Sequence, residues 1–174
     1  QPGARNPRRL HRHRATGPTA AHAHPHTALS QAHRGSPTQR IAQLVEQGHT
    51  SSQRLEVKSE DVTIAGSRAV LESALVNLVE NASDFGPDHS TIALETKMEE
   101  GFLKFSVTDQ GPGIPEFAIS RAFERFYSLP RPDNKRKSTG LGLCFVKEAA
   151  ELHGGKAEIQ NTGSGACASI SIPL

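Results

Sequence analysis

The stretch Asp109 to Gly113 (DQGPG) joins one carboxylate to two glycines at the end of an apolar alternation. The alternation, Phe102 to Thr108, predicts a strand, and the acid and glycines predict a sharp turn after it. A carboxylate delivered in this way can accept the exocyclic amino hydrogens of adenine. Gly111 and Gly113 would let the backbone pass close to a flat ring, where a Cβ atom would collide. The same pattern also describes many ordinary strand-to-loop turns. Other stretches of the sequence must therefore decide between a base-binding site and such a turn.

Two asparagines, Asn77 and Asn81, lie one helical turn apart in residues 68–85. The apolar residues of this segment recur at spacings of three and four, which predicts an amphipathic helix. They are Val70, Leu71, Ala74, Leu75, Leu78, Val79 and Ala82. Asn77 and Asn81 therefore stack on another side of the helix, together with Glu80 and Asp84. The alternative is that both asparagines are simply solvated. Asparagine is a poor helix former, however, so a pair at this spacing calls for a functional reason. Two amide oxygens there can orient a hydrated Mg²⁺ that also holds phosphates.

Residues 139–143 (TGLGL) place two glycines at the start of a segment that predicts a helix to about His153. The free N–H groups and the positive dipole end at such a start form a phosphate cradle. The preceding residues 128–138 hold two prolines, several basic residues and one apolar residue, Leu129, and predict a loop. A basic loop beside a triphosphate can screen the phosphates, whereas the alternative is a solvated loop without function.

The charge distribution divides the chain. Residues 1–40 hold seven Arg and no Lys, Asp or Glu, whereas residues 41–174 hold 13 Lys and Arg against 18 Asp and Glu. Residues 1–38 contain few large apolar residues and are predicted to be a disordered basic segment. A nucleic-acid-binding basic arm is a weaker alternative. A metal site built from His22, His24 and His26 is another, and no Cys or acid lies nearby to complete it. We expect no nucleic-acid partner.

The absence of acids from residues 1–38 also fits an out-of-frame reading of a GC-rich gene. The segment can therefore be a non-native addition to a domain at residues 39–174. No run of about 18 apolar residues is present, so no membrane span is expected. The two cysteines, Cys144 and Cys167, are predicted to be reduced core residues, which fits a cytoplasmic location.

The remaining elements follow from turn residues and apolar periods. Ser67 is the expected N-cap of the helix at 68–85, and Gly154 and Gly155 are expected to end the last helix. Beyond Pro115 we expect a helix that contains Ile119, Ala122 and Phe123. A short helix is expected at 41–45, and strands at 54–57, 62–65, 91–96, 102–108, 156–161 and 166–172.

Four of these stretches carry a family resemblance. NLVEN (77–81), DQGPG (109–113), FERFY (123–127) and STGLGL (138–143) resemble the N, G1, F and G2 boxes of the catalytic ATP-binding domain of bacterial sensor histidine kinases. The resemblance covers roughly residues 40–174. It implies the Bergerat-type α/β fold shared with DNA gyrase B, Hsp90 and MutL: a two-layer sandwich of a mixed, largely antiparallel sheet with about three helices on one face.

Within the kinases, FYSLPRP followed by GLGLCFVKE is similar to the CreC group of inner-membrane sensors, which pass phosphate to a CreB-type response regulator. The resemblance implies transfer of the ATP γ-phosphate to a histidine on a dimerisation domain, then to an aspartate of the regulator. Positioning and charge neutralisation supply most of the catalysis in such phosphoryl transfer.

The resemblance also implies a role for each matching residue. Asn81 would ligate Mg²⁺, Asn77 would support the metal and phosphates, and Glu80 would help to polarise the attacking histidine. Asp109 would take the adenine amino group. Further contacts with ATP are implied for Gly111, Gly113, Arg125, Lys137, Thr139, Gly140, Leu141 and Gly142. The resemblance further implies that Phe123 and Phe126 anchor the lid, which is the basic loop at 128–138.

Three departures from the family pattern stand out. Asp84 occupies a position that is often basic, so one phosphate contact is expected to be missing, and Ser138 replaces a common glycine. None of the nine histidines is followed by Asp or Glu, as the family's acceptor histidine would be. We therefore expect an ATP-binding fragment without its acceptor histidine. An ATP-binding module without kinase activity is the alternative; a clamp of the MutL or Hsp90 kind would need a longer lid.

Overall fold

A computed structural model describes residues 52–60, 65–131 and 138–174. The predictions for residues 1–38, for the helix at 41–45, for residues 62–64 of one strand and for Lys137 lie outside these ranges. The elements are β1 (Arg54–Lys58), α2 (Arg68–Phe85), β2 (Thr91–Glu99), β3 (Phe102–Thr108), α3 (Glu116–Ile119), α4 (Gly142–Leu152), β4 (Lys156–Asn161) and β5 (Ala166–Pro173).

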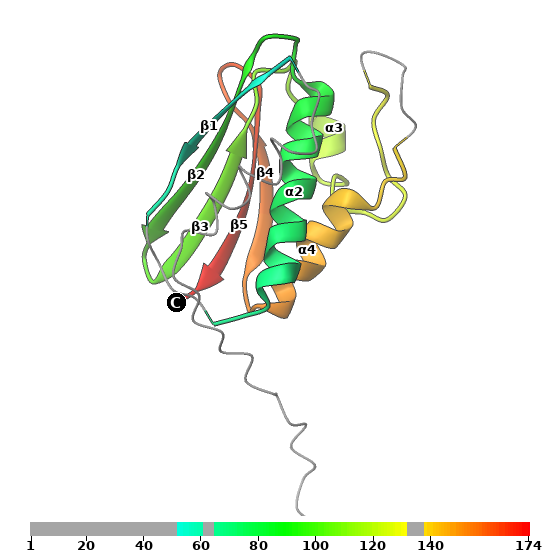
Figure 1. The fold of residues 1–174 in the computed structure, drawn as a ribbon. Helices are drawn as coiled ribbons and strands as arrows, with labels where there is room; N and C mark the ends of the chain where they lie inside the picture. Colours follow the sequence, from blue (N-terminus) through cyan, green and yellow to red (C-terminus); the bar gives the residue numbers. More distant parts are fainter. Residues whose placement is uncertain (1–51, 61–64, 132–137) are drawn as a thin grey trace, which may run out of the picture.

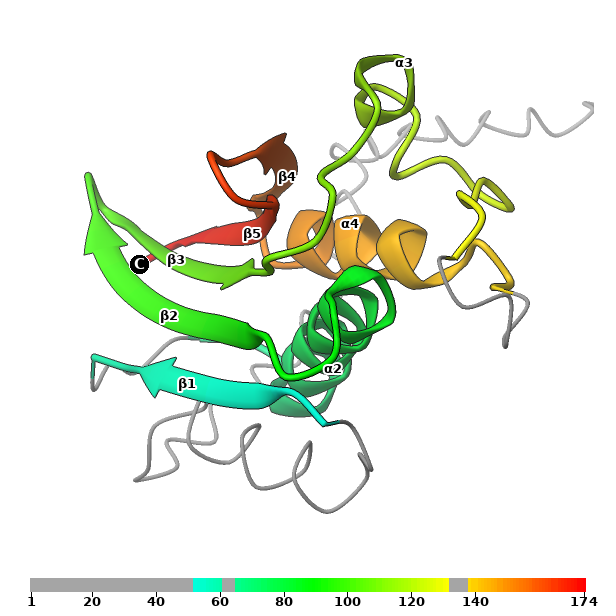
Figure 2. The ribbon, with the colours of Figure 1, turned by 90° about the horizontal axis from the view of Figure 1, so that it is seen from above.

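The strands form one sheet in the order β1-β2-β3-β5-β4. β1 pairs with β2 in parallel, and the other neighbours are antiparallel. The two long helices, α2 and α4, lie on the same face of this sheet, and α3 is a single short turn beyond them (Figure 1, Figure 2). The predicted two-layer α/β architecture with a mixed, largely antiparallel sheet is therefore confirmed.

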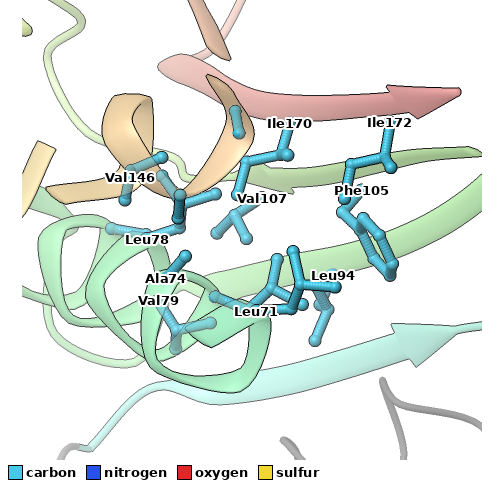
Figure 3. Close-up of a cluster of buried hydrophobic side chains, with 14 of the residues drawn as sticks. Leu71, Ala74, Leu78, Val79, Leu94, Phe105, Val107, Val146, Ile170 and Ile172 are labelled. Atoms are coloured by element: carbon cyan, nitrogen blue, oxygen red, sulfur yellow. The ribbon is translucent and has the colours of Figure 1, made fainter. Parts of the chain in front are cut away.

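The hydrophobic core fills the space between the helices and the sheet (Figure 3). The 3.6-residue period of α2 and the two-residue period of the strands turn their apolar side chains to this space. Phe105 is fully buried there, and its partners in the neighbouring strands are Thr96 of β2 and Ile170 of β5. Burial of a side chain of this size contributes about 1.5–3 kcal/mol. The core thus fixes α2 against β3, the two elements that carry Asn81 and lead to Asp109.

A two-residue turn joins β2 to β3. Glu99 pairs with Phe102, and both turn residues, Glu100 and Gly101, have positive φ angles of 49° and 82°. Positive φ at both positions is typical of a type I′ hairpin turn, whose twist matches that of the strands. The strands predicted at 91–96 and 102–108 are both present, although β2 extends to Glu99 rather than ending at Thr96.

The ends of the helices differ in part from prediction. α2 begins after Ser67 as expected, but the Ser67 side chain makes no capping bond; instead its backbone N–H donates to Nε2 of His153 at 3.0 Å. The helix expected beyond Pro115 is wrong in extent, since α3 ends at Ile119 and a series of tight turns follows. No helix in the described ranges is long and apolar enough to cross a bilayer.

Candidate functional site

A cavity of about 110 Å³ opens beside the C-terminal part of α2. This volume is several times that needed by one water molecule. Most of the lining is apolar, with Leu78, Val107 and Ala168 among its walls. The polar side chains that line it include those of Asn81 and Asp109. A flat, largely apolar ligand with a few polar atoms suits such a cavity.

The carboxylate of Asp109 is buried and fixed in orientation. Its backbone N–H donates to the carbonyl of Ala166 at 2.9 Å, which continues the pairing of β3 with β5. Oδ1 accepts the N–H of Gly111 at 2.8 Å and the N–H of Ala166 at 3.1 Å. Oδ2 has no hydrogen-bond donor within the described part of the chain. One oxygen therefore holds the carboxylate in place while the other stays available to a ligand in the cavity.

Glycines allow the backbone to approach this carboxylate. A Cβ atom at Gly165 would collide with the carbonyl oxygen of Asp109. A Cβ atom at Gly111 would lie 2.6 Å from the carbonyl oxygen of Phe85. Gly111 is not among the residues that line the cavity, and the close approach seen there is to the end of α2. Its expected contact with a base stays a prediction.

Asn161, at the end of β4, holds the loop that follows DQGPG. Its Oδ1 accepts the N–H of Ile114 at 2.7 Å, and its Nδ2 donates to the carbonyl of Ile114 at 2.8 Å. Gly113 lines the cavity with φ of 76°, and a Cβ atom there would lie 2.8 Å from Asn161 Oδ1. The sequence analysis missed Asn161, because an asparagine before a Gly-rich turn carries no signal beyond the turn itself.

The two asparagines of α2 face the start of α4. A Cβ atom at Gly142 would lie 2.9 Å from Oδ1 of Asn77 and 3.6 Å from Nδ2 of Asn81. Nδ2 of Asn77 donates to the carbonyl of Ser73 at 2.9 Å, which directs the amide oxygen of Asn77 toward Gly142. Asn81 and Gly142 both line the cavity, whereas Asn77 lies behind them. The structure thus brings together three residues that the sequence analysis selected.

The first backbone bond within α4 runs from Phe145 N–H to the carbonyl of Leu141 at 2.9 Å. The N–H groups of the first helical residues therefore have no partner within the helix, and they carry the positive end of its dipole. This end of α4 meets the cavity at Gly142 and Leu143. An anionic group in the cavity would find N–H donors there.

The side-chain oxygens near Gly142 would suit a magnesium ion only if phosphate oxygens completed its coordination. Within residues 52–60, 65–131 and 138–174, no group of three or more His, Cys, Asp or Glu side chains could hold a metal. Mg²⁺ is commonly held by one or two protein oxygens, several waters and the phosphates of the substrate. Asn81 lines the cavity and carries an amide oxygen that can supply such a ligand, although Nδ2 is the atom that faces Gly142.

Residues 66–174 match the family of histidine kinase-, DNA gyrase B- and HSP90-like ATPases. The chain belongs to this family. The chain is 44% identical over 126 residues to the sensor protein CreC of Escherichia coli K12, a match that covers 72% of this chain. The chain spans only 26% of the length of CreC.

Solved structures agree with the family. The ATPase domain aligns with the mycobacterial sensor histidine kinase MprB with a TM-score of 0.67 and 25% identity, over 79% of this chain and 91% of that one. It aligns with full-length ShkA in complex with AMPPNP with a TM-score of 0.65 and 26% identity, over 79% of this chain and 29% of that one. The fold is therefore that of the ATP-binding catalytic domain of sensor histidine kinases.

The ATPase domain holds other predicted site residues outside the cavity. Glu80, Thr139 and Leu141 are exposed and do not line it. Arg125 is also exposed, and it forms an ion pair of 2.5 Å with Glu148 of α4. The hydrogen bond between them raises the pKa of Arg125 and lowers the pKa of the Glu148 carboxyl group.

Gly140 lines the cavity and lies just before the start of α4. Its φ is 66°, its N–H donates to Oγ of Ser138 at 3.2 Å, and its carbonyl accepts the N–H of Phe126 at 2.9 Å. Phe123 packs against the core, but the side chain of Phe126 is 76% exposed. Phe126 has a φ of 63°, and its backbone N–H makes the contact with Gly140. The lid residues 132–137 lie outside the described ranges, so the role of Phe126 in the lid stays a prediction.

Proposed function

We propose that this ATPase domain binds ATP with Mg²⁺ and transfers the γ-phosphate to a histidine on a separate dimerisation domain, for onward transfer to an aspartate of a response regulator. One observation carries the proposal. A single cavity is lined both by Asp109, a carboxylate with a free oxygen, and by Asn81 with Gly142 at the start of α4. The first feature suits an adenine base and the second suits phosphates.

Adenine would lie between the apolar walls with its amino group toward Oδ2 of Asp109. The walls include Leu78, Val107 and Ala168, and burial of a flat ring against them is favourable. Guanine carries a carbonyl oxygen where adenine carries its amino group. Two acceptors would then face each other without a proton, which costs about 1–3 kcal/mol for a buried group. The site should therefore prefer ATP to GTP.

The phosphates would meet the N–H groups at the start of α4, beside Gly140 and Gly142. Mg²⁺, when bound, would neutralise phosphate charge and orient the triphosphate, with Asn81 as its protein ligand and Asn77 in support. Glu80 is exposed next to Asn81 on α2, where a histidine presented by another domain can reach it. In this position its carboxylate can accept a proton from the imidazole and so polarise the nucleophile.

Further contacts with the phosphates are proposed for Arg125, Lys137, Thr139 and Leu141, as the resemblance implies. Arg125 would have to leave Glu148 to reach them. The likeness to CreC supports a CreB-like response regulator as partner and a cytoplasmic location below a membrane-anchored sensor.

A second candidate function is ATP binding without phosphoryl transfer. The ion pair between Arg125 and Glu148 favours it, because this pair keeps a cation that transfer would use outside the cavity.

Calorimetric titration of ATP into the 174-residue chain, with and without Mg²⁺, tests the binding part. We expect binding that Mg²⁺ strengthens and a loss of the Mg²⁺ effect in Asn81→Ala. Ser73→Ala, an exposed position two turns earlier on α2, is the control and should keep the effect. A folded chain that binds no ATP would contradict the proposal.

Incubation with radiolabelled ATP and a histidine-bearing dimerisation domain added in trans separates the two candidates. Kinase activity predicts acid-labile label on the added domain, lost when its histidine is replaced. ATP binding without any label on that domain would support the second function.

A further inference from the structure

Asp84 and Arg131 form an ion pair between α2 and the segment that follows α3. Nη2 of Arg131 lies 2.5 Å from Oδ2 of Asp84, and the two side chains are 14% and 23% exposed. Every other ion pair between described residues has at least one side chain that is more than 40% exposed. The pair is therefore the most shielded from solvent in the part of the chain that the structure describes.

The position of the pair relates it to the cavity, although neither residue lines it. Asp84 precedes Phe85 on α2, and Phe85 lines the cavity. Arg131 lies two residues after the segment 127–129, which we call the outer wall and which also lines the cavity. The ion pair thus joins α2 to the outer wall at one edge of the cavity.

The surroundings of the pair make it costly to break. Nε of Arg131 is buried and has no hydrogen-bond partner within the described residues, so Asp84 is the group that compensates the guanidinium charge. Removal of one partner from a shielded pair leaves the other charge without compensation, and the chain must move to hydrate it. Since Arg131 lies two residues after Leu129, such a movement would carry the outer wall with it.

We propose that Arg131 is a positioning residue of the nucleotide site, which together with Asp84 holds the outer wall against α2 before ATP binds. A preformed wall spares the ligand the cost of ordering it. The ion pair also explains how an acidic residue is accommodated near the proposed phosphate position. Arg131 neutralises the charge of Asp84, which is therefore not directed at the ligand. This inference rests on the proposed ATP binding.

The test compares ATP affinity in four variants of the whole chain by calorimetry. Asp84→Asn and Arg131→Gln should each weaken ATP binding about tenfold. The charge exchange Asp84→Arg with Arg131→Asp should restore the affinity to within about threefold of the original. Arg68→Gln is the matched control, because Arg68 pairs with Glu72 at the other end of α2 and should leave the affinity unchanged.

A second measurement separates positioning from a general loss of stability. Amide hydrogen exchange in the ATP-free chain should become faster in the outer wall in Arg131→Gln, while exchange in β3 and β5 stays the same. Unchanged hydrogen exchange in the outer wall of Arg131→Gln would overturn the inference. A weaker ATP affinity in Arg131→Gln without a weaker affinity in Asp84→Asn would overturn it too. Arg131 would then be assigned to direct ligand contact or to no role. Absence of ATP binding by the unaltered chain would instead overturn the proposed function.

Discussion

Nε2 of His153 accepts a hydrogen bond of 3.0 Å from the backbone N–H of Ser67, 86 residues earlier in the chain. The opposite ring nitrogen, Nδ1, lies 2.7 Å from the carbonyl oxygen of Ala149, which fits the tautomer with a proton on Nδ1. A Cβ atom at Gly66 would collide with the imidazole, so a glycine there makes room for it. One imidazole thereby joins the end of α4 to the start of α2, the two helices that supply Gly142 and Asn81.

His153→Ala should lower the free energy of unfolding by about 0.5–1.5 kcal/mol, because the half-buried N–H of Ser67 loses its acceptor. Urea denaturation followed by circular dichroism measures the change. Ser67→Ala is the matched control. Loss of an N-cap side chain usually costs about 0.5–2 kcal/mol, but the side chain of Ser67 makes no capping bond here, so we expect almost no change. Equal effects of the two substitutions would contradict the assignment of His153 as the cap.

Asp109→Asn should leave the chain folded and reduce ATP affinity at least tenfold. Oδ1 accepts two N–H groups, so the amide oxygen of an asparagine will be held at that position. Its NH₂ group must then replace Oδ2 and will face the amino group of adenine, donor against donor. Calorimetry with ATP and GTP measures both affinity and selectivity. The exposed Asp88→Asn should change neither, and an undiminished preference for ATP in Asp109→Asn would remove Asp109 from base recognition.

Asn161→Ala should weaken ATP binding about threefold to tenfold with little loss of stability. Both hydrogen bonds of the side chain go to Ile114, so their loss frees the loop that places Gly113 on the cavity wall. Gln160→Ala, at the preceding exposed position of β4, is the control. Asn161→Asp keeps the acceptor for Ile114 N–H but turns the donor into an acceptor, and should fall between the two. If Asn161→Ala binds ATP like the control, the loop does not depend on Asn161.

Glu148→Gln tests the exposed ion pair with Arg125. Because Arg125 lowers the pKa of Glu148 in the folded chain, the pair stabilises the fold above the ordinary carboxyl pKa of about 4.3. That contribution is lost as the pH falls through the lower folded pKa. The stability difference between the original chain and Glu148→Gln should therefore be small at pH 7, decrease with added salt and vanish in acid. Urea titrations at several pH values measure it, with Glu151→Gln as the control; a difference that grows in acid would have the wrong sign.

The same substitution bears on catalysis. Release of Arg125 from Glu148 should increase the rate of phosphoryl transfer to an added dimerisation domain if Arg125 serves the terminal phosphate. An unchanged rate in Glu148→Gln would show that the ion pair does not restrain Arg125.

Elements with a local signal could be predicted from the sequence. The apolar period predicted both ends of α2 (Arg68–Phe85), because a helix buries one stripe of side chains and 18 residues reveal that stripe clearly. The two-residue alternation before DQGPG predicted β3 and therefore the place where Asp109 leaves the sheet. The spacing of Asn77 and Asn81 predicted that they share one side of α2. The stretch at 139–143 predicted the region in which α4 begins, and the structure starts the helix at Gly142.

Contacts between residues far apart in the chain could not be predicted from the sequence and became visible in the folded chain. Asn161 holds Ile114 across 47 residues, Arg131 neutralises Asp84 across the same separation, and His153 caps Ser67 across 86. Each of these side chains is polar and lies at the end of a strand, in a loop or at the end of a helix, where its local sequence fits a solvated residue equally well. Their partners are set by the packing of α2 and α4 on the sheet, and that packing is a property of the whole core rather than of any one segment.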